Sequence, residues 1–398
     1  MKKIFTAAFL LVAVVLSSVF GAFALNTSSA DTATQTNSSS TEQDAKVDTK
    51  KLTDISSILN TVGTNVSVSA DSAVLYCVNN GTVIFAKNPN RKMKMASTTK
   101  VMTALLALEA AAADDKIVTF TQEMVAEGSS MYLKVGDKVK LSDLAVGMLL
   151  CSGNDAANAA AIGIAGSKES FAVMMNKRAE QIGMKNTNFV TPSGLDDEQH
   201  YSTAYDMALL FAYAMENETF TEISIKKTAR VEFASPQGKA NTYSNHNKLL
   251  SRYENCIGGK TGFTKAAGRC LVSAAEKNNL RYVAVTLKAS DDWNDHAAMF
   301  DFGFDSLAVI RCSDTQTEFA TNVVGGTADT TALVSPNSID FVVTKDKAAD
   351  IERTVYIPKF IYAPVRQDVQ VGRVVYKLGG KFLAQSKILS AEEIEYKE

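Results

Sequence analysis

The sequence predicts an α+β domain followed by a small all-β domain. Strand-like runs open the globular part of the chain and return later, helical patterns lie between them, and short alternating apolar runs follow residue 310. A sheet formed from both ends of a domain, with helices in the middle, is an α+β arrangement. Of the 398 residues, 46% are hydrophobic and 21% are charged, which is typical of a globular protein with a sizeable core.

The first residues have the pattern of an export signal. Lys2 and Lys3 precede a long apolar run, and Ala22-Phe23-Ala24 supplies a small-x-small cleavage pattern. We therefore expect residues 1–24 to be a signal peptide, with an uncleaved membrane anchor as the alternative. Residues 25–52 are polar and poor in large apolar side chains, which predicts a disordered linker. Both readings of the leader place the rest of the chain outside the cytoplasm.

Residues 53–308 are expected to form the first domain. Two strands, over 67–75 and 82–86, are separated by Asn79-Asn80-Gly81, which is a hairpin signal. Helices are expected from Ser97 onward and over 154–164, 201–216 and 293–304. Further strands are expected over 228–234, 254–263, 268–275 and 281–288.

Residues 309–398 are expected to form a second, β-rich domain. Short alternating runs predict strands over 339–344, 353–357, 369–375 and 382–389, and Gly372 and Gly379-Gly380 punctuate them. A segment of this length lies within the usual size range of a domain.

The helix expected after Met95-Ala96 carries the first chemical signal. Ser97 and Lys100 are three residues apart and therefore share a helix face. Both lie in the first turn, where unpaired backbone N–H groups favour a negative charge on the serine and disfavour a charged lysine. A neutral lysine beside a serine hydroxyl can act as a general base. A second Ser-x-x-Lys pair, Ser224 and Lys227, has no long apolar helix behind it and is interpreted as a chance match.

Two further motifs follow in order. Ser152-Gly153-Asn154 precedes an Ala-rich helix, and Lys260-Thr261-Gly262 ends a strand-like run. Each is common alone, since Ser-Gly-Asn also suits a turn or a helix cap. The ordered triplet of Ser-x-x-Lys, Ser-x-Asn and Lys-Thr-Gly is specific to penicillin-interacting serine enzymes. The sequence Ser335-Pro336-Asn337 fails the order because it follows the Lys-Thr-Gly.

Composition disfavours several other functions. The net charge of −2 gives no sign of a nucleic-acid partner. The three histidines, His200, His246 and His296, have no metal-ligand spacing, and the five cysteines include no Cys-x-x-Cys pair. Cys256 and Cys270 flank a predicted strand, and whether they form a disulfide stays open at this point.

With these motifs in place, the chain resembles the low-molecular-mass penicillin-binding proteins that are serine-type D-alanyl-D-alanine carboxypeptidases. The resemblance covers most of residues 60–398. It is densest over 95–100, 150–156, 191–196, 201–208 and 259–264. It implies a β-lactamase/transpeptidase-like domain, with an antiparallel sheet flanked by helices, and a C-terminal β domain.

The resemblance also implies a role for each motif residue. Ser97 attacks a D-Ala-D-Ala peptide of the peptidoglycan stem and forms an acyl-enzyme, Lys100 takes its proton, and Ser152 relays a proton to the leaving D-alanine. Asn154 orients Lys100 and the substrate amide, and Lys260 and Thr261 receive the terminal carboxylate of the substrate. Gly262 also belongs to the substrate-binding residues. The backbone N–H groups of Ser97 and Phe263 form the oxyanion hole. β-Lactam antibiotics are implied as covalent inhibitors, and neither a metal nor an organic cofactor is needed.

Alternatives stay open beside this reading. A class A β-lactamase would need a deacylating glutamate, and no Glu-x-x-Leu-Asn segment lies between Ser152 and Lys260. A non-catalytic cell-wall-binding protein is disfavoured by the intact triplet, whereas an endopeptidase would use the same residues. The end of the chain, residues 390–398, is short and acidic and lacks the basic amphipathic face of an interfacial anchor. We therefore expect an exported cell-wall enzyme that is at most loosely held at the membrane.

Overall fold

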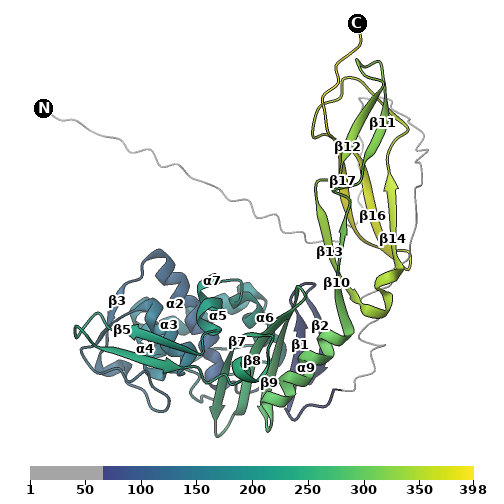
Figure 1. Ribbon diagram of the computed structural model, residues 1–398. Coiled ribbons are helices and arrows are strands. Elements are labelled where there is room, and N and C mark those ends of the chain that lie inside the picture. The colour runs from purple at the N-terminus through teal and green to yellow at the C-terminus, as the bar shows by residue number, and fades with distance from the viewer. Residues whose placement is uncertain (1–65) are drawn as a thin grey trace, which may run out of the picture. The chain divides into compact units, whose positions relative to one another are not determined.

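The computed structural model describes residues 66–398 (Figure 1). The expected signal peptide over 1–24, the expected linker over 25–52 and the start of the first predicted domain lie outside the described residues. Within the described range, no helix is long and apolar enough to cross a membrane.

A five-stranded antiparallel sheet is the centre of the first half of the fold. Its strands are β1 (Ser72–Cys77), β2 (Thr82–Lys87), β7 (Cys256–Thr264), β8 (Gly268–Lys277) and β9 (Leu280–Ala289). They lie in the order β2-β1-β9-β8-β7, so strands from the two ends of this region share one sheet, as predicted. The sequence also placed the β1–β2 hairpin correctly. This order leaves β7, which carries Lys260-Thr261-Gly262, at an edge of the sheet.

Helices cover both faces of this sheet (Figure 1). One face packs against a helical layer that includes α2 and α6, while α9 packs on the other. The alternation of side chains in a strand produces this division: Val74 joins the core beneath α2, whereas Ala73 and Leu75 pack towards α9. The helices are α2 (Lys100–Ala113), α3 (Leu141–Leu150), α4 (Asn154–Ala165), α5 (Lys168–Ile182), α6 (Ala204–Ala214), α7 (Glu218–Ser224), α8 (Leu249–Arg252) and α9 (Asp292–Ser306). Two small strand pairs accompany them, β3 (Ile117–Thr119) with β4 (Lys138–Lys140) and β5 (Thr228–Glu232) with β6 (Ala240–Ser244).

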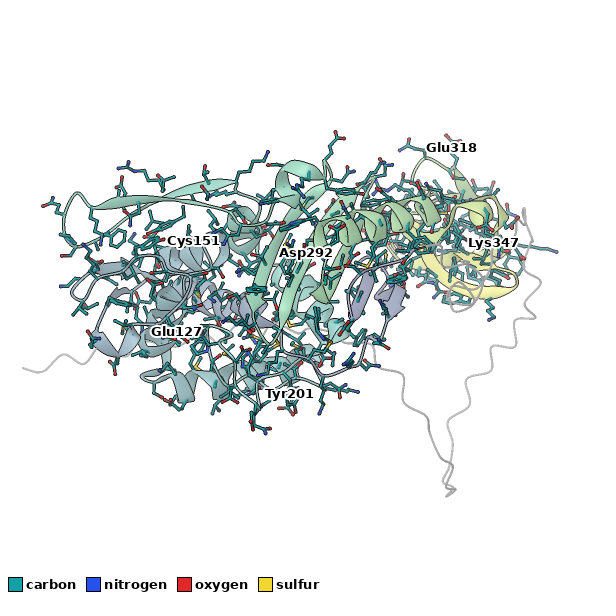
Figure 2. The ribbon with its side chains drawn as sticks, turned by 90° about the horizontal axis from the view of Figure 1, so that it is seen from below. Glu127, Cys151, Tyr201, Asp292, Glu318 and Lys347 are labelled. Carbon is teal, nitrogen blue, oxygen red and sulfur yellow. The ribbon has the colours of Figure 1, made fainter. Side chains whose placement is uncertain are left out.

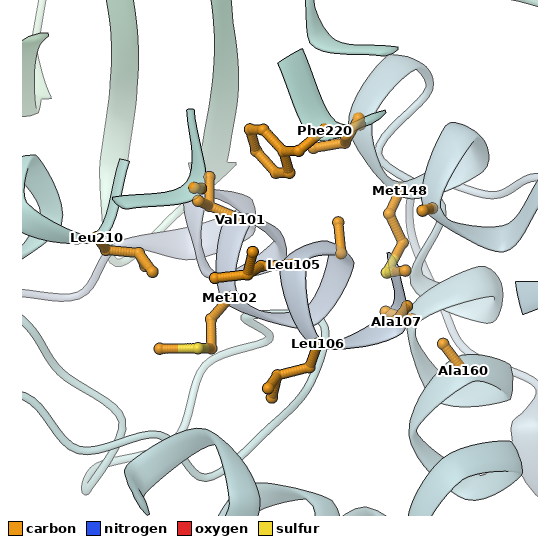
Figure 3. Close-up of a cluster of buried hydrophobic side chains, with 14 of the residues drawn as sticks. Val101, Met102, Leu105, Leu106, Ala107, Met148, Ala160, Leu210 and Phe220 are labelled. Atoms are coloured by element: carbon orange, nitrogen blue, oxygen red, sulfur yellow. The ribbon is translucent and has the colours of Figure 1, made fainter. Parts of the chain in front are cut away.

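Helix α2 is buried on every side along its first nine residues, from Lys100 to Leu108. Figure 3 shows its side chains among Met148 of α3, Ala160 of α4 and Phe220 of α7. The small side chains of α4 allow its backbone to approach α2 closely, and a side chain such as Phe220 contributes about 3–5 kcal/mol to stability by the usual cost of its truncation. The position of the residues at the start of α2 is therefore fixed by the core.

The structure refines the predicted helices in two places. The helix expected from Ser97 begins as a 3-10 turn over Ala96–Thr99, and the α-helix proper starts at Lys100. The helix expected over 201–216 corresponds to α6 but is shorter, spanning Ala204–Ala214. The side chain of Asn217 accepts a hydrogen bond from the backbone N–H of Phe220 and caps the next helix, α7. Helices α3, α5, α7 and α8 have no counterpart among the expected helices.

The C-terminal part is all β apart from a short 3-10 segment, Lys345–Asp350. A two-stranded sheet joins β10 (Leu307–Ser313) to β13 (Ser338–Thr344). A six-stranded sheet has the order β14-β16-β17-β12-β11-β15. Its strands are β11 (Phe319–Val324), β12 (Thr330–Val334), β14 (Ile351–Tyr356), β15 (Phe360–Tyr362), β16 (Gln370–Leu378) and β17 (Lys381–Ser390). The four strands predicted here correspond to β13, β14, β16 and β17, and the predicted fold class is confirmed.

All five cysteines are free thiols. Cys256 stands opposite Ala275 in the β7–β8 ladder, and Cys270 stands opposite Gly262. The pairing that the sequence left open between Cys256 and Cys270 is therefore not formed.

Candidate active site

The amine of Lys100 is at the centre of a buried hydrogen-bond cluster. Its Nζ lies 2.9 Å from Ser97 Oγ, 2.6 Å from Asn154 Oδ1 and 2.6 Å from the carbonyl oxygen of Ser193. An ammonium has three donors and can satisfy all three acceptors, whereas a neutral amine can instead accept a proton from Ser97. Ser97 lies one 3-10 turn before Lys100, next to Ala96, whose φ of +48° is rare for a residue with a side chain. Local strain of this kind is typical of functional sites.

Burial lowers the pKa of Lys100 well below its ordinary value. The side chain has no exposed surface, so the charged form loses its hydration. The positive charge of Lys260 lowers the pKa further by repulsion, and the nearby carboxylate of Asp155 acts in the opposite direction. Burial and the charge of Lys260 together favour a neutral Lys100 amine beside the Ser97 hydroxyl.

Ser152 and Lys260 form a second serine–lysine pair near Ser97. Ser152 lies in the turn between α3 and α4 with a φ of +62°, and its Oγ accepts a hydrogen bond of 3.0 Å from Lys260 Nζ. The same ammonium donates to the carbonyl oxygen of Thr261 at 2.6 Å. Burial lowers the pKa of Lys260 to about 7. Near neutral pH, this pair can therefore hold or release a proton.

Asn154 and Asp155 attach a neighbouring loop to the site. Asn154, the first residue of α4, donates from Nδ2 to the carbonyl oxygen of Glu127 at 2.6 Å. The buried carboxylate of Asp155 accepts hydrogen bonds from Ser130 Oγ and from the backbone N–H groups of Met131 and Leu133. The sequence analysis assigned no role to Asp155. Its signal was weak, because an aspartate in a first helical turn is common for purely local reasons.

Two glycines, Gly262 and Gly194, allow strand β7 and the loop around Gly194 to pack closely against the turn that carries Ser97. A Cβ on Gly262 of β7 would lie 2.9 Å from the carbonyl oxygen of Met95 and 3.0 Å from the Ser97 nitrogen. A Cβ on Gly194, which has a φ of +81°, would lie 2.0 Å from the carbonyl oxygen of Ala96. Only glycine permits both approaches. They hold the 3-10 turn that carries Ser97 between β7 and the loop around Gly194.

His200 supports the same turn from behind. Its Nδ1 lies 2.9 Å from the Val190 nitrogen and 3.2 Å from the Thr191 nitrogen, so it accepts from both backbone N–H groups. Its Nε2 therefore carries the proton and donates to Thr99 Oγ1 at 2.9 Å. Burial lowers the pKa of His200 to about 4, so the ring is neutral at physiological pH. The sequence analysis considered this histidine only as a metal ligand.

An open cavity of about 470 Å³ lies in front of these groups. Ser97 and Ser152 reach its wall, together with Ser129 and the β7 residues Thr261, Gly262 and Phe263. The two lysines and Asn154 lie behind that wall, at most 5% exposed. The remaining lining residues are His246, Lys248, Arg269, Asp292 and Trp293. Among the residues that the structure describes, no cluster of His, Cys, Asp or Glu is arranged to hold a metal ion.

The residues of the two chance motifs lie elsewhere. Ser224 is fully buried, with its Oγ 3.8 Å from Met215 Sδ. Ser335 Oγ pairs with Ser386 Oγ at 2.9 Å in the C-terminal part. Neither serine has a lysine amine within hydrogen-bond distance in the described structure, which distinguishes both from Ser97.

Two family models match the chain. The model described as D-alanyl-D-alanine carboxypeptidase matches residues 59–291. The model described as penicillin-binding protein 5, C-terminal domain, matches residues 316–396. Together they cover both parts of the described fold.

Individual relatives agree with these matches. The chain is 32% identical over 336 residues to the D-alanyl-D-alanine carboxypeptidase DacF of Bacillus subtilis (82% of this chain, 86% of the relative). It is 31% identical over 346 residues to DacC of Escherichia coli K12, another D-alanyl-D-alanine carboxypeptidase (83% of this chain, 85% of the relative).

Solved structures are similar too. Penicillin-binding protein 5 from Haemophilus influenzae has a TM-score of 0.64 at 28% identity (84% of this chain, 100% of the other). The Streptomyces K15 DD-transpeptidase has a TM-score of 0.58 at 29% identity (61% of this chain, 99% of the other).

Proposed function

The chain belongs to the D-alanyl-D-alanine carboxypeptidase family, and from this premise we propose a role for each residue of its active site. As a serine-type enzyme of this penicillin-binding family, it removes the terminal D-alanine from peptidoglycan stem peptides. The observation that carries the assignment of roles is the contact of 2.9 Å between Lys100 Nζ and Ser97 Oγ, inside a buried pocket that lowers the pKa of the lysine.

Acylation begins when neutral Lys100 takes the proton of the Ser97 hydroxyl. Ser97 Oγ then attacks the carbonyl carbon between the two D-alanines, and the carbonyl π electrons move onto its oxygen. The backbone N–H groups of Ser97 and Phe263 stabilise that oxyanion, which is the role of such donors in acyl transfer. The close packing of Gly262 against the Ser97 turn supports this arrangement, because it brings β7 next to the Ser97 nitrogen.

Departure of D-alanine needs a proton on its nitrogen. Ser152 supplies its hydroxyl proton to that nitrogen as the C–N bond breaks, and Lys260 restores the Ser152 proton through their hydrogen bond of 3.0 Å. A lysine whose pKa is lowered to about 7 is well suited to this exchange near neutral pH. Asn154 holds Lys100 through Oδ1, and Thr261 and Gly262 line the cavity where the substrate binds.

Water completes the reaction. Before this step, Lys100 releases the proton that it took from Ser97 and Lys260 regains the proton that it gave to Ser152, so Lys100 is neutral again. Water then attacks the acyl carbon while Lys100 accepts one of its protons, and Lys100 passes that proton to Ser97 Oγ as the ester bond breaks. The sequence offers no equivalent of the deacylating glutamate of class A β-lactamases. We therefore expect the penicilloyl-enzyme to hydrolyse slowly, so that penicillin inhibits the enzyme.

The test is release of D-alanine from diacetyl-Lys-D-Ala-D-Ala. Wild type should release D-alanine, and penicillin should stop the release at one equivalent per site. Ser97→Ala should abolish both release and penicillin labelling, whereas the matched Ser224→Ala should retain both. Sustained hydrolysis of penicillin would favour a β-lactamase, and labelling without peptide turnover would contradict the carboxypeptidase role.

The cellular placement and the domain limits belong to the same proposal. Ala22-Phe23-Ala24 supports a mature chain that starts near Leu25 and acts at the cell wall. Within residues 66–398, the five-stranded and six-stranded sheets share no strand, which supports domains over 53–308 and 309–398. N-terminal sequencing of the exported protein tests the first point, because retention of Met1 in a form that only detergent extracts would contradict it.

A further inference from the structure

Two of the three donors of the Lys260 ammonium are used within the protein. It donates to Ser152 Oγ and to the Thr261 carbonyl oxygen, and the residue is only 1% exposed. Lys260 contributes positive potential to the cavity, but it is not among the residues that line it. A substrate carboxylate therefore needs another cation for direct contact.

Two cations line the cavity in front of Ser97, Arg269 and Lys248. Arg269 lies on β8 directly opposite Phe263 of the edge strand β7, and both residues line the cavity. Lys248 is exposed, and its side chain forms no ion pair or hydrogen bond within residues 66–398. A lysine of this kind is not preorganised, because its four-carbon stem remains free to rotate.

Arg269, in contrast, is held in place. Its Nη2 donates to the buried carboxylate of Asp292, the first residue of α9 (Figure 2). Its guanidinium also lies 5.8 Å from the ring centroid of Trp293. Asp292 bonds to only one end of the planar fork, and Arg269 Nε is buried without a hydrogen-bond partner in the described structure. The side chain of Arg269 is 43% exposed and lines the cavity, so the fork is anchored and still accessible from the cavity.

We propose that Arg269 receives the terminal carboxylate of the substrate, beside Thr261, and that Asp292 and Trp293 position it for this contact. The proposal rests on the carboxypeptidase function described above. A guanidinium matches the geometry of a carboxylate and keeps its charge throughout the physiological pH range. Lys260, whose pKa is lowered to about 7, loses part of its charge in the same range. Arg269 thus recognises the free C-terminus while Lys260 serves the proton relay.

The experiment compares two substrates that differ only in this charge. One is an acylated D-alanyl thioester whose thiol leaving group ends in a carboxylate, and the other is its methyl ester. Arg269→Gln should lower kcat/KM for the carboxylate by about 10- to 100-fold, the usual scale for losing a hydrogen bond to a charged group. The methyl ester should be hydrolysed at nearly the wild-type rate. Arg269→Lys should recover only part of the loss, because it keeps the charge without the fork.

Two matched variants decide the assignment. Lys248→Gln removes the other cation of the cavity wall, and Arg230→Gln removes an exposed arginine of β5 that pairs with Glu232. Both should keep the wild-type preference for the carboxylate. The proposal is overturned if Arg269→Gln, at an unchanged melting temperature, keeps that preference, slows both substrates equally, or is matched by Lys248→Gln. If wild type hydrolyses neither thioester, the carboxypeptidase function itself fails.

Discussion

Replacing Asn154 by aspartate tests whether Lys100 acts as a neutral base. The change preserves the shape of the side chain but puts a negative charge at the position of Oδ1, which lies 2.6 Å from Lys100 Nζ. With an effective dielectric constant of about 20, the gross attraction between unit charges at that distance is about 6 kcal/mol. Rearrangement and residual water reduce the net effect, and opposite charges at such distances typically shift a titration by about 1–3 pH units.

The direction of the pH shift depends on whether the neutral or the charged form of Lys100 is the active one. Burial favours the neutral amine in the wild type, and a carboxylate partner favours the ammonium, so Asn154→Asp raises the pKa of Lys100. The acid limb of the acylation profile should therefore move to higher pH by about 1–3 units, with the rate recovering at alkaline pH. The assay measures the second-order rate constant of acylation by penicillin from about pH 5 to about pH 10. Measurements are spaced by about half a pH unit, so that they resolve the titration of a lysine.

Asn158 supplies the matched control. It is buried on the same helix, α4, and its Nδ2 contacts the Met124 carbonyl oxygen at 3.3 Å instead of Lys100. Asn158→Asp should leave the acid limb in place. The reasoning is refuted if Asn154→Asp folds normally and keeps the wild-type profile, or if its activity falls equally at every pH.

Three further predictions concern the scaffold. Gly194→Ala puts a Cβ 2.0 Å from the Ala96 carbonyl oxygen, so it should destabilise the fold by about 2 kcal/mol or more in denaturant titrations and slow acylation; unchanged acylation would contradict the packing argument. Burial lowers the pKa of His296 to about 3 from 6.5, so protonation of the unfolded chain should cost about 2 kcal/mol of stability between pH 6.5 and pH 5. Urea titrations at the two pH values measure this decrease in the free energy of unfolding. His296→Gln should make the decrease smaller by that amount, and an unchanged decrease would contradict the prediction. Because all five cysteines are free, dithiothreitol should not change the melting temperature, and a drop would reveal a disulfide.

The sequence predicted the architecture well wherever periodicity and punctuation were strong. The hairpin at Asn79-Asn80-Gly81 and the long strands β8 and β9 were located within a few residues. Helix α7, which Asn217 caps, was missed because asparagine suits the end of one helix and the start of the next equally well. The C-terminal strands β10, β11, β12 and β15 were missed because few of their side chains are buried in the core.

The site was predictable only in part. Ordered motifs identified Ser97, Lys100, Ser152 and Lys260, which the fold brings into two adjoining serine–lysine pairs. Their support was hidden, because Asp155 and His200 act through backbone N–H groups of distant loops. Such contacts depend on tertiary approach and leave no local pattern in the chain.

The most direct test of the central claim is the location of the penicillin adduct. The enzyme is labelled, denatured and digested, and the modified peptide is sequenced by mass spectrometry. We predict a single penicilloyl group on Ser97, since Ser97 Oγ reaches the cavity with the amine of buried Lys100 2.9 Å behind it. An adduct on Ser152 or Ser224, or no adduct on an enzyme that releases D-alanine, would contradict this account.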